Sequence, residues 1–244
     1  MMIKAKLYFK NGIDIGRLMD DLQGLPESIR PLYFAEDEGR IIKANKLTDD
    51  GRFKDFRKRN QTGFFLYAEN ETCFDISTRR TGYAEVTLYL VDCLSSELVG
   101  VFLKSLAGNK FVFGFGCYDE EHEHRNRHYI TIGKNHIESW IGRDLEKYIP
   151  GVYWYTLLSD ELLSKHGVDL ASLSAEAITT ETLGDGSLHL LKFYENPEDW
   201  KENAERLDDL CERTDGVFSR RPIEVAVISV SNYLEYDDII AEWR

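Results

Sequence analysis

Residues 63–91 read GFFLYAENETCFDISTRRTGYAEVTLYLV. Three short runs of aromatic and β-branched residues, at 63–67, 73–77 and 85–91, are separated by turns rich in Asn, Gly and Thr. Runs of this kind are typical of strands that pair with their neighbours through short connections. The stretch therefore predicts three adjacent strands of a mainly antiparallel sheet.

Further signals extend this sheet on both sides. A strand is expected at 3–9, followed by an amphipathic helix that contains Ile15, Leu18 and Leu22 at helical spacing. Downstream we expect a helix over 95–106, begun by Ser95 and ended by Gly108, and then a strand at 111–117. This order indicates an α+β fold with helices packed on one face of a mainly antiparallel sheet, and it is compatible with a ferredoxin-like topology.

The second half repeats the theme more loosely. Its expected strands cover 128–132, 152–156, 179–183, 188–194 and 223–230, and its expected helices cover 143–149, 160–166 and a segment from Asn196, with residues 233–244 as a polar tail or short helix. Asn196 and Pro197 form the strongest helix start, because Asn caps free amides and Pro suits the first helical position. No linker divides the chain. We therefore expect an N-terminal half (1–127) and a C-terminal half (128–244) that pack as one body or form a single domain.

Charge limits the partners that the chain can take. There are 43 acidic and 30 basic residues, which gives a formal net charge of −13. A field of this sign repels phosphate and attracts cationic proteins, so we expect no direct nucleic-acid ligand. Residues 52–59 run against the trend, with five basic residues around Phe53 and Phe56. They predict a short helix with a solvated basic face, and a nucleic-acid patch is the sharper alternative.

Location and cysteine usage follow from the same sequence. There is no apolar core of a signal peptide and no run of the ~18 apolar residues that a membrane span needs, so we expect a cytoplasmic protein without a membrane partner. The four cysteines, which are Cys73, Cys93, Cys117 and Cys211, form no Cys-x-x-Cys pair. Reduced and mostly buried thiols are expected, rather than zinc ligands or disulfides.

The densest cluster of reactive side chains is the segment 119–128, which holds three of the six histidines and four carboxylates. We interpret it as a solvated loop between two strands. The alternative is a site for zinc or another divalent ion, built from His122, His124 and His128. The chain has no nucleophile elbow, phosphate loop or dinucleotide fingerprint. The sequence therefore predicts no catalytic residue and no cofactor.

Four segments carry a family resemblance, and they are Gly151–Trp154, Ser159–Gly167, Gly184–Leu190 and Asn196–Trp200. This succession of a Val-Tyr-Trp strand, a short helix, a Gly-containing turn before an apolar strand and a Pro-Asp-Trp-like helix start resembles bacterial type VI secretion immunity proteins and related polymorphic-toxin immunity families. The resemblance implies a cytoplasmic protein that binds and neutralises a cognate toxin and has no catalytic activity.

Acidic residues beside aromatic ones suit an interface with a basic toxin. The residues predicted for this contact are Tyr118, Glu120, Glu121, Glu123, Tyr236, Asp237 and Asp238. Two other functions stay open at this point. One is a metal-dependent hydrolase that uses the three histidines of 119–128. The other is a regulatory binding subunit of a defence system, which would form a stable complex with a larger neighbouring gene product.

Overall fold

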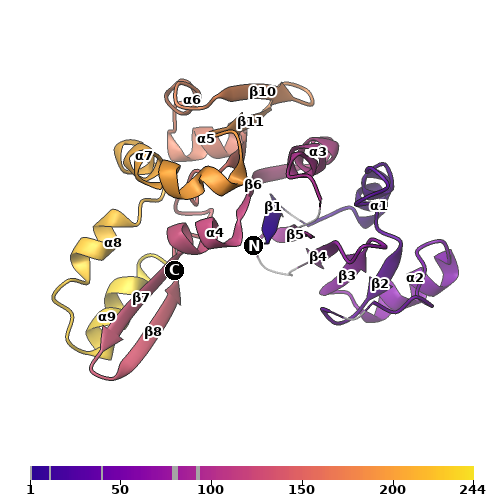
Figure 1. Cartoon of the computed structure of the whole chain (residues 1–244), viewed down its shortest axis with the longest axis horizontal. Helices are drawn as coiled ribbons and strands as arrows, with labels where there is room; N and C mark the ends of the chain where they lie inside the picture. The colour runs from indigo at the N-terminus through magenta and orange to yellow at the C-terminus, as the bar shows by residue number, and fades with distance from the viewer. Residues whose placement is uncertain (1, 11, 40, 79–81, 92–93) are drawn as a thin grey trace. The chain divides into compact units, whose positions relative to one another are not determined.

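The computed structural model describes residues 2–10, 12–39, 41–78, 82–91 and 94–244, which form two compact units (Figure 1). The first unit comprises Met1–Gly116, Thr156–Ser159 and Glu181–Leu190. The second comprises Cys117–Tyr155, Asp160–Thr180 and Leu191–Arg244. The division at residue 127 stays a prediction.

An antiparallel sheet forms the frame of the first unit, and it has nine strands within the described ranges. Their order is β10, β11, β9, β6, β1, β5, β4, β3 and β2. Their bounds are β1 (Ile3–Phe9), β2 (Tyr33–Ala35), β3 (Gly63–Tyr67), β4 (Cys73–Ser77), β5 (Ala84–Leu90), β6 (Phe111–Tyr118), β9 (Tyr155–Ser159), β10 (Thr179–Leu183) and β11 (Leu188–Lys192). The three strands predicted from 63–91 are confirmed as the neighbours β3, β4 and β5.

The described part of this unit has three helices, which are α1 (Ile15–Gln23), α2 (Asp50–Arg59) and α3 (Glu97–Ser105). Phe56 of α2 contacts Phe34 and Phe64, with ring centroids 4.7 and 6.2 Å apart. Phe102 of α3 lies 5.9 Å from Phe74. Because the register places Phe34, Phe64 and Phe74 on one face of the sheet, α2 and α3 cover that face. The basic segment 52–59 is thus the predicted helix with Phe53 and Phe56 on its inner side.

Glycine allows β6 to pack closely in the centre of the sheet. A Cβ on Gly114 would lie 2.5 Å from Leu7 Cδ2 and 3.1 Å from the Lys6 carbonyl oxygen. Every residue of β6 is buried. The strand is therefore a core strand in which Gly114 leaves space for the neighbouring Leu7 side chain.

The second unit is built from helices and one hairpin. Its elements are α4 (Asp119–Asn126), β7 (Arg127–Ile132), β8 (Asn135–Trp140), α5 (Asp160–His166), α6 (Leu170–Ser174), a 3-10 turn (Pro197–Asp199), α7 (Trp200–Arg213), α8 (Arg221–Ala226) and α9 (Tyr233–Ala241). The predicted start at Asn196 is confirmed, because Asn196 and Asp199 form a capping box at the turn that leads into α7. The predicted helix at 160–166 is confirmed as α5.

Three predictions for this unit are wrong. Residues 119–126 form α4 instead of a loop, and residues 143–149 form turns instead of a helix. Residues 221–226 form α8, which overlaps the segment 223–230 that was expected to be a strand. Ile223 and Val227 are buried whereas Val225 and Ile228 are exposed, which is the spacing of a helix and not the alternation of a strand.

The coarse fold class is confirmed as α+β with an antiparallel sheet. Two ferredoxin-like halves are not shown by the strand order. The side chains of Cys73, Cys117 and Cys211 are buried as expected, and Cys93 lies outside the described residues. None of the helices in the described ranges is long and apolar enough to cross a bilayer.

Candidate partner-binding surface

Four of the seven predicted contact residues lie on or next to α4 in the second unit. The distribution of charge along this segment explains why it forms a helix. Three acidic residues stand in its first turn and His124 and Arg125 in its last, which complements the helix dipole. Glu121 pairs with Arg125, and Glu123 pairs with Arg127, each four residues apart. These pairs stabilise a helix and not a loop. The i,i+4 spacing was the signal in the sequence that would have predicted α4.

The three histidines of this segment do not converge. The His122 ring lies 5.2 Å from the Trp140 ring, His124 Nε2 lies 3.0 Å from Asp208 Oδ2, and His128 Nδ1 lies 3.1 Å from the Tyr236 hydroxyl oxygen. Successive helical residues point about 100° apart, so His122 and His124 face different neighbours. No group of three or more His, Cys, Asp or Glu side chains in the described ranges could hold a metal ion. The arrangement therefore does not support the alternative of a histidine-based hydrolase.

Glu121 is the centre of a buried charge network. Its side chain is fully buried and accepts hydrogen bonds from Arg125 Nε at 3.3 Å and from the Tyr194 hydroxyl. Arg125 also donates to Asp208 Oδ1 at 2.8 Å. Burial raises the pKa of Glu121, although the Arg125 charge and the hydrogen bonds oppose this rise. Glu121 therefore lies in the interior of the unit and not on the surface where the sequence predicted a partner contact.

Two predicted aromatic contacts are buried as well. The Tyr118 hydroxyl donates to Glu198 Oε1 at 2.9 Å, and only 7% of the residue is exposed. Tyr236 is fully buried in the cluster that α8 and α9 form with the hairpin. Neither side chain is at the surface, where it could anchor a partner. The prediction that Tyr118 and Tyr236 contact a partner is therefore corrected. Aromatic residues next to acids were assigned to the surface because the sequence does not show which face of a helix is covered.

The other predicted acids lie at the surface, but most already have a partner. Glu120 pairs with Lys201 at 3.3 Å, Glu123 with Arg127, and Asp237 with Arg244 at 2.7 Å. Glu120 and Glu123 line a shallow hollow of about 300 Å³. The remaining lining residues are His124, Arg127, Tyr129, Trp200, Lys201 and Arg220. Because three cations face two carboxylates there, this hollow is not an acidic recognition site.

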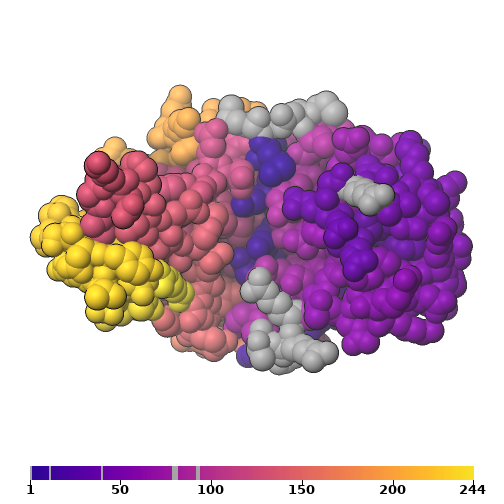
Figure 2. All heavy atoms as spheres, turned by 90° about the horizontal axis from the view of Figure 1, so that it is seen from below, coloured from indigo at the N-terminus to yellow at the C-terminus, as the bar shows by residue number. Residues whose placement is uncertain are grey.

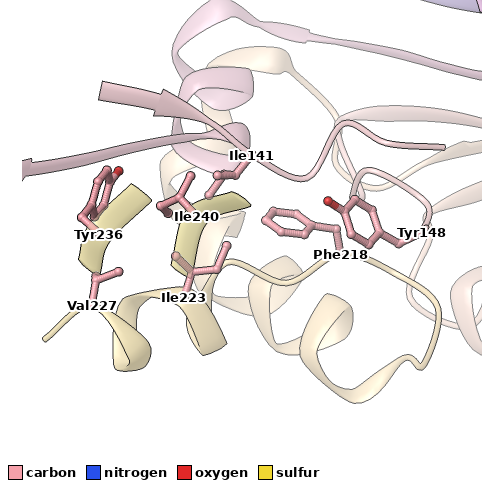
Figure 3. Close-up of a cluster of buried hydrophobic side chains, with 7 residues drawn as sticks. All are labelled: Ile141, Tyr148, Phe218, Ile223, Val227, Tyr236 and Ile240. Atoms are coloured by element: carbon pink, nitrogen blue, oxygen red, sulfur yellow. The ribbon is translucent and has the colours of Figure 1, made fainter. Parts of the chain in front are cut away.

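The C-terminal helices pack on the β7–β8 hairpin. Figure 3 shows the buried side chains of α8 and α9 pointing toward one another and toward Ile141. The full cluster is Ile141, Tyr148, Phe218, Ile223, Val227, Tyr236 and Ile240. Ile130, Ile132 and Ile137 of the hairpin pack against it. In Figure 2 the yellow C-terminal segment accordingly lies beside the rose-coloured hairpin at the surface.

Four large apolar side chains are exposed where α8 passes into α9. Val225 is 71% exposed, Ile228 83%, Tyr233 53% and Leu234 74%. We call this set the C-terminal apolar patch. Its members fall within residues 225–234, and the predicted contact residue Asp238, which is exposed, follows four residues later in the sequence. Single exposed apolar residues are ordinary, whereas a group of them marks an interaction surface. Sequence reasoning missed the patch because 223–230 was taken for a buried strand.

The packing of this region predicts a pH dependence. Burial lowers the pKa of His128, Arg220 lowers it further, and Glu224 raises it. The pKa of His128 is thus lower in the folded chain than in the unfolded chain. The stability that neutral His128 contributes is therefore present above about pH 6.5 and is lost as the pH falls. We expect the free energy of unfolding to decrease between pH 7 and pH 5, by at most about 1.4 kcal/mol per pH unit for this proton.

Urea titrations at several pH values measure this slope. His128→Gln should flatten it, whereas His136→Gln, a matched change at an exposed position of the hairpin, should not. Equal slopes for the parent protein and His128→Gln would contradict the assignment.

Searches against family models, curated proteins and solved structures find no match to this chain.

Proposed function

We propose that this chain is a cytoplasmic binding protein that attaches to a cognate toxin and neutralises it, without catalysing a reaction. The resemblance of residues 151–200 to toxin-immunity proteins motivates the proposal. The observation that carries it is the C-terminal apolar patch, because four large apolar side chains exposed within ten residues suit the centre of a protein interface.

The charge around the patch indicates the chemistry of the partner. Residues 221–244 carry five carboxylate side chains and two arginines. The whole chain has a net charge of −13, so its field speeds the approach of a basic protein. We therefore expect a partner that presents an apolar groove bordered by lysine or arginine. The apolar centre would supply most of the affinity, and the charges would supply orientation and rate.

A pull-down from the lysate of the source cells, eluted with rising salt, tests the proposal. Recovery of one basic protein at equal stoichiometry, whose toxicity or activity the purified chain suppresses, is the expected result. A stable complex with a larger protein that has no toxic activity would instead favour a regulatory subunit. No stoichiometric partner would oppose both forms of the binding function.

Variants of the C-terminal apolar patch test whether the partner binds at this surface. Ile228→Lys and Leu234→Lys place a cation in the apolar centre, and each is expected to weaken binding by about thirtyfold or more, as loss of an interface hot spot does. Both positions are largely exposed, so the melting temperature should stay within a few degrees of the parent value.

Ile178→Lys is the matched control, because Ile178 is 45% exposed and lies outside the patch. Calorimetry with the purified partner measures the three affinities. A partner that binds Ile228→Lys and Leu234→Lys as tightly as it binds Ile178→Lys would exclude the patch as the interface.

A further inference from the structure

A second surface of interest lies in the first unit, on the sheet face opposite α2 and α3. Tyr33 pairs with Tyr67, Tyr67 with Cys73, and Cys73 with Tyr89 across β2, β3, β4 and β5. Directly opposed residues point to the same face of a sheet, so the four side chains form one continuous row. We call it the tyrosine row. It consists of three aromatic rings and a thiol side by side.

The tyrosine row forms the floor of a hollow of about 800 Å³. Its walls come from the chain between β2 and α2, from the β3–β4 turn and from residues near the ends of β1 and β5. The wall residues are Met2, Glu38, Gly39, Ile41, Lys43, Glu69, Glu71, Leu90 and Val91. The amide of Gly39 donates to the Tyr67 hydroxyl at 2.8 Å, which joins one wall to the floor. This volume is that of a pocket for a small organic ligand.

Carboxylates outnumber cations among the described residues that line the hollow. Three carboxylates, from Glu38, Glu69 and Glu71, face the single ammonium of Lys43 among the described lining residues. Glu69 accepts hydrogen bonds from the Tyr33 hydroxyl at 2.5 Å and from Lys43 Nζ at 3.1 Å. Lys43 is therefore engaged by Glu69. The described part of the chain shows no ion pair for Glu38 or Glu71, and both residues are exposed.

Two side chains of the floor, Cys73 and Tyr89, carry no charge at neutral pH. Burial raises the pKa of the Cys73 thiol to about 12, the Tyr67 hydrogen bond lowers it, and the carboxylates of Asp75 and Glu38 raise it. Burial likewise raises the pKa of Tyr89 to about 12; the Lys6 charge opposes this rise, and the carboxylates of Asp75 and Glu38 add to it. At neutral pH the thiol and the phenol are thus protonated. A protonated thiol is a poor nucleophile, so this floor is suited to binding and not to covalent chemistry.

We propose that the hollow binds an organic cation, whose ammonium or guanidinium group lies between Glu38 and Glu71 while its apolar body lies on the tyrosine row. Aromatic faces attract cations, and carboxylates form charge-assisted hydrogen bonds with them. A free metal ion would leave the aromatic floor unused. The same chemistry is offered by a small free cation and by the arginine or lysine side chain of a peptide.

Calorimetry on the purified full chain tests this site with two probes. Agmatine supplies a free guanidinium and ammonium, and the blocked peptide acetyl-Gly-Arg-Gly-amide supplies an arginine side chain without other charges. Saturable 1:1 binding of agmatine assigns the site to free cations, and binding of the peptide alone assigns it to a side chain of a partner. Failure of both probes to bind saturably at millimolar concentration overturns the proposal.

Variants separate this site from general attraction to an acidic protein. Glu38→Gln combined with Glu71→Gln removes two exposed carboxylates, and we expect binding to weaken by about tenfold to a hundredfold. Glu36→Gln is the matched control, since Glu36 is exposed and does not line the hollow. Equal affinity in the double variant and the control would show attraction to net charge alone and would overturn the proposal. The experiment needs no protein partner, so its outcome is independent of the C-terminal apolar patch.

Discussion

Replacing Arg125 with methionine is expected to lower the free energy of unfolding by about 3–5 kcal/mol, the usual cost of breaking a buried ion pair from one side. Arg125 is 4% exposed and bonds to Glu121 and Asp208. Its removal leaves Glu121, which is fully buried, without the positive charge that balances it. Urea unfolding followed by tryptophan fluorescence measures the loss.

Two further variants make this result interpretable. Arg213→Met breaks the exposed pair with Glu176 and should cost under about 1 kcal/mol. The double variant Glu121→Gln/Arg125→Met removes both charges, so it should recover part of the stability and remain measurable if the single variant fails to fold. Because protonation of Glu121 removes the unbalanced charge, the deficit of Arg125→Met should shrink as the pH falls. Equal losses in Arg125→Met and Arg213→Met would contradict the buried network.

Asn126→Ala is expected to cost about 2–4 kcal/mol, because it leaves several buried polar groups without partners. Asn126 Nδ2 lies 3.2 Å from the carbonyl oxygens of Ile141, Gly142 and Pro150. Its Oδ1 accepts from the Tyr153 hydroxyl at 2.5 Å. One side chain thus joins the end of α4 to two turns, and alanine fills none of these roles.

Asn126→Asp distinguishes the donor from the acceptor. Aspartate keeps the acceptor for Tyr153, but its second oxygen faces the three carbonyl oxygens. We expect a loss at neutral pH that decreases in acid, when the carboxyl group can donate. Asn135→Ala, at an exposed position of the hairpin, is the control. A loss for Asn126→Ala no larger than that for Asn135→Ala would contradict the role of this hydrogen-bond group.

The sequence predicted the first unit well, because its elements follow local patterns. The strands β3, β4 and β5 are short aromatic runs between turns, and α2 and α3 have one apolar side each. These signals reside within a few residues of one another. The tyrosine row was not predicted, although Tyr67, Cys73 and Tyr89 lie on predicted strands. It depends on the register between strands, which a single sequence does not specify.

The second unit was predicted less well, because long-range contacts decide which charges are buried. The Glu121 carboxylate meets Tyr194, 73 residues away, and Arg125 meets Asp208, 83 residues away. Charged residues are mostly exposed, so assigning 119–128 to a solvated loop was the ordinary expectation. The β-branched run at 223–230 favoured a strand for the same local reason, whereas packing against the hairpin selects a helix.

The hairpin of β7 and β8 also has a consequence for the order of events on the ribosome. A lone two-stranded ribbon is at best marginally stable in water, and this one obtains its apolar cover from α8 and α9. His128 on the ribbon and its partner Tyr236 are separated by 108 residues. At bacterial or eukaryotic synthesis speeds of about 5–20 residues per second, the ribbon therefore waits roughly 5–20 s for its cover after it has been translated. During that interval its isoleucines lack this cover, and the packing of the unit is complete only after α8 and α9 have been made.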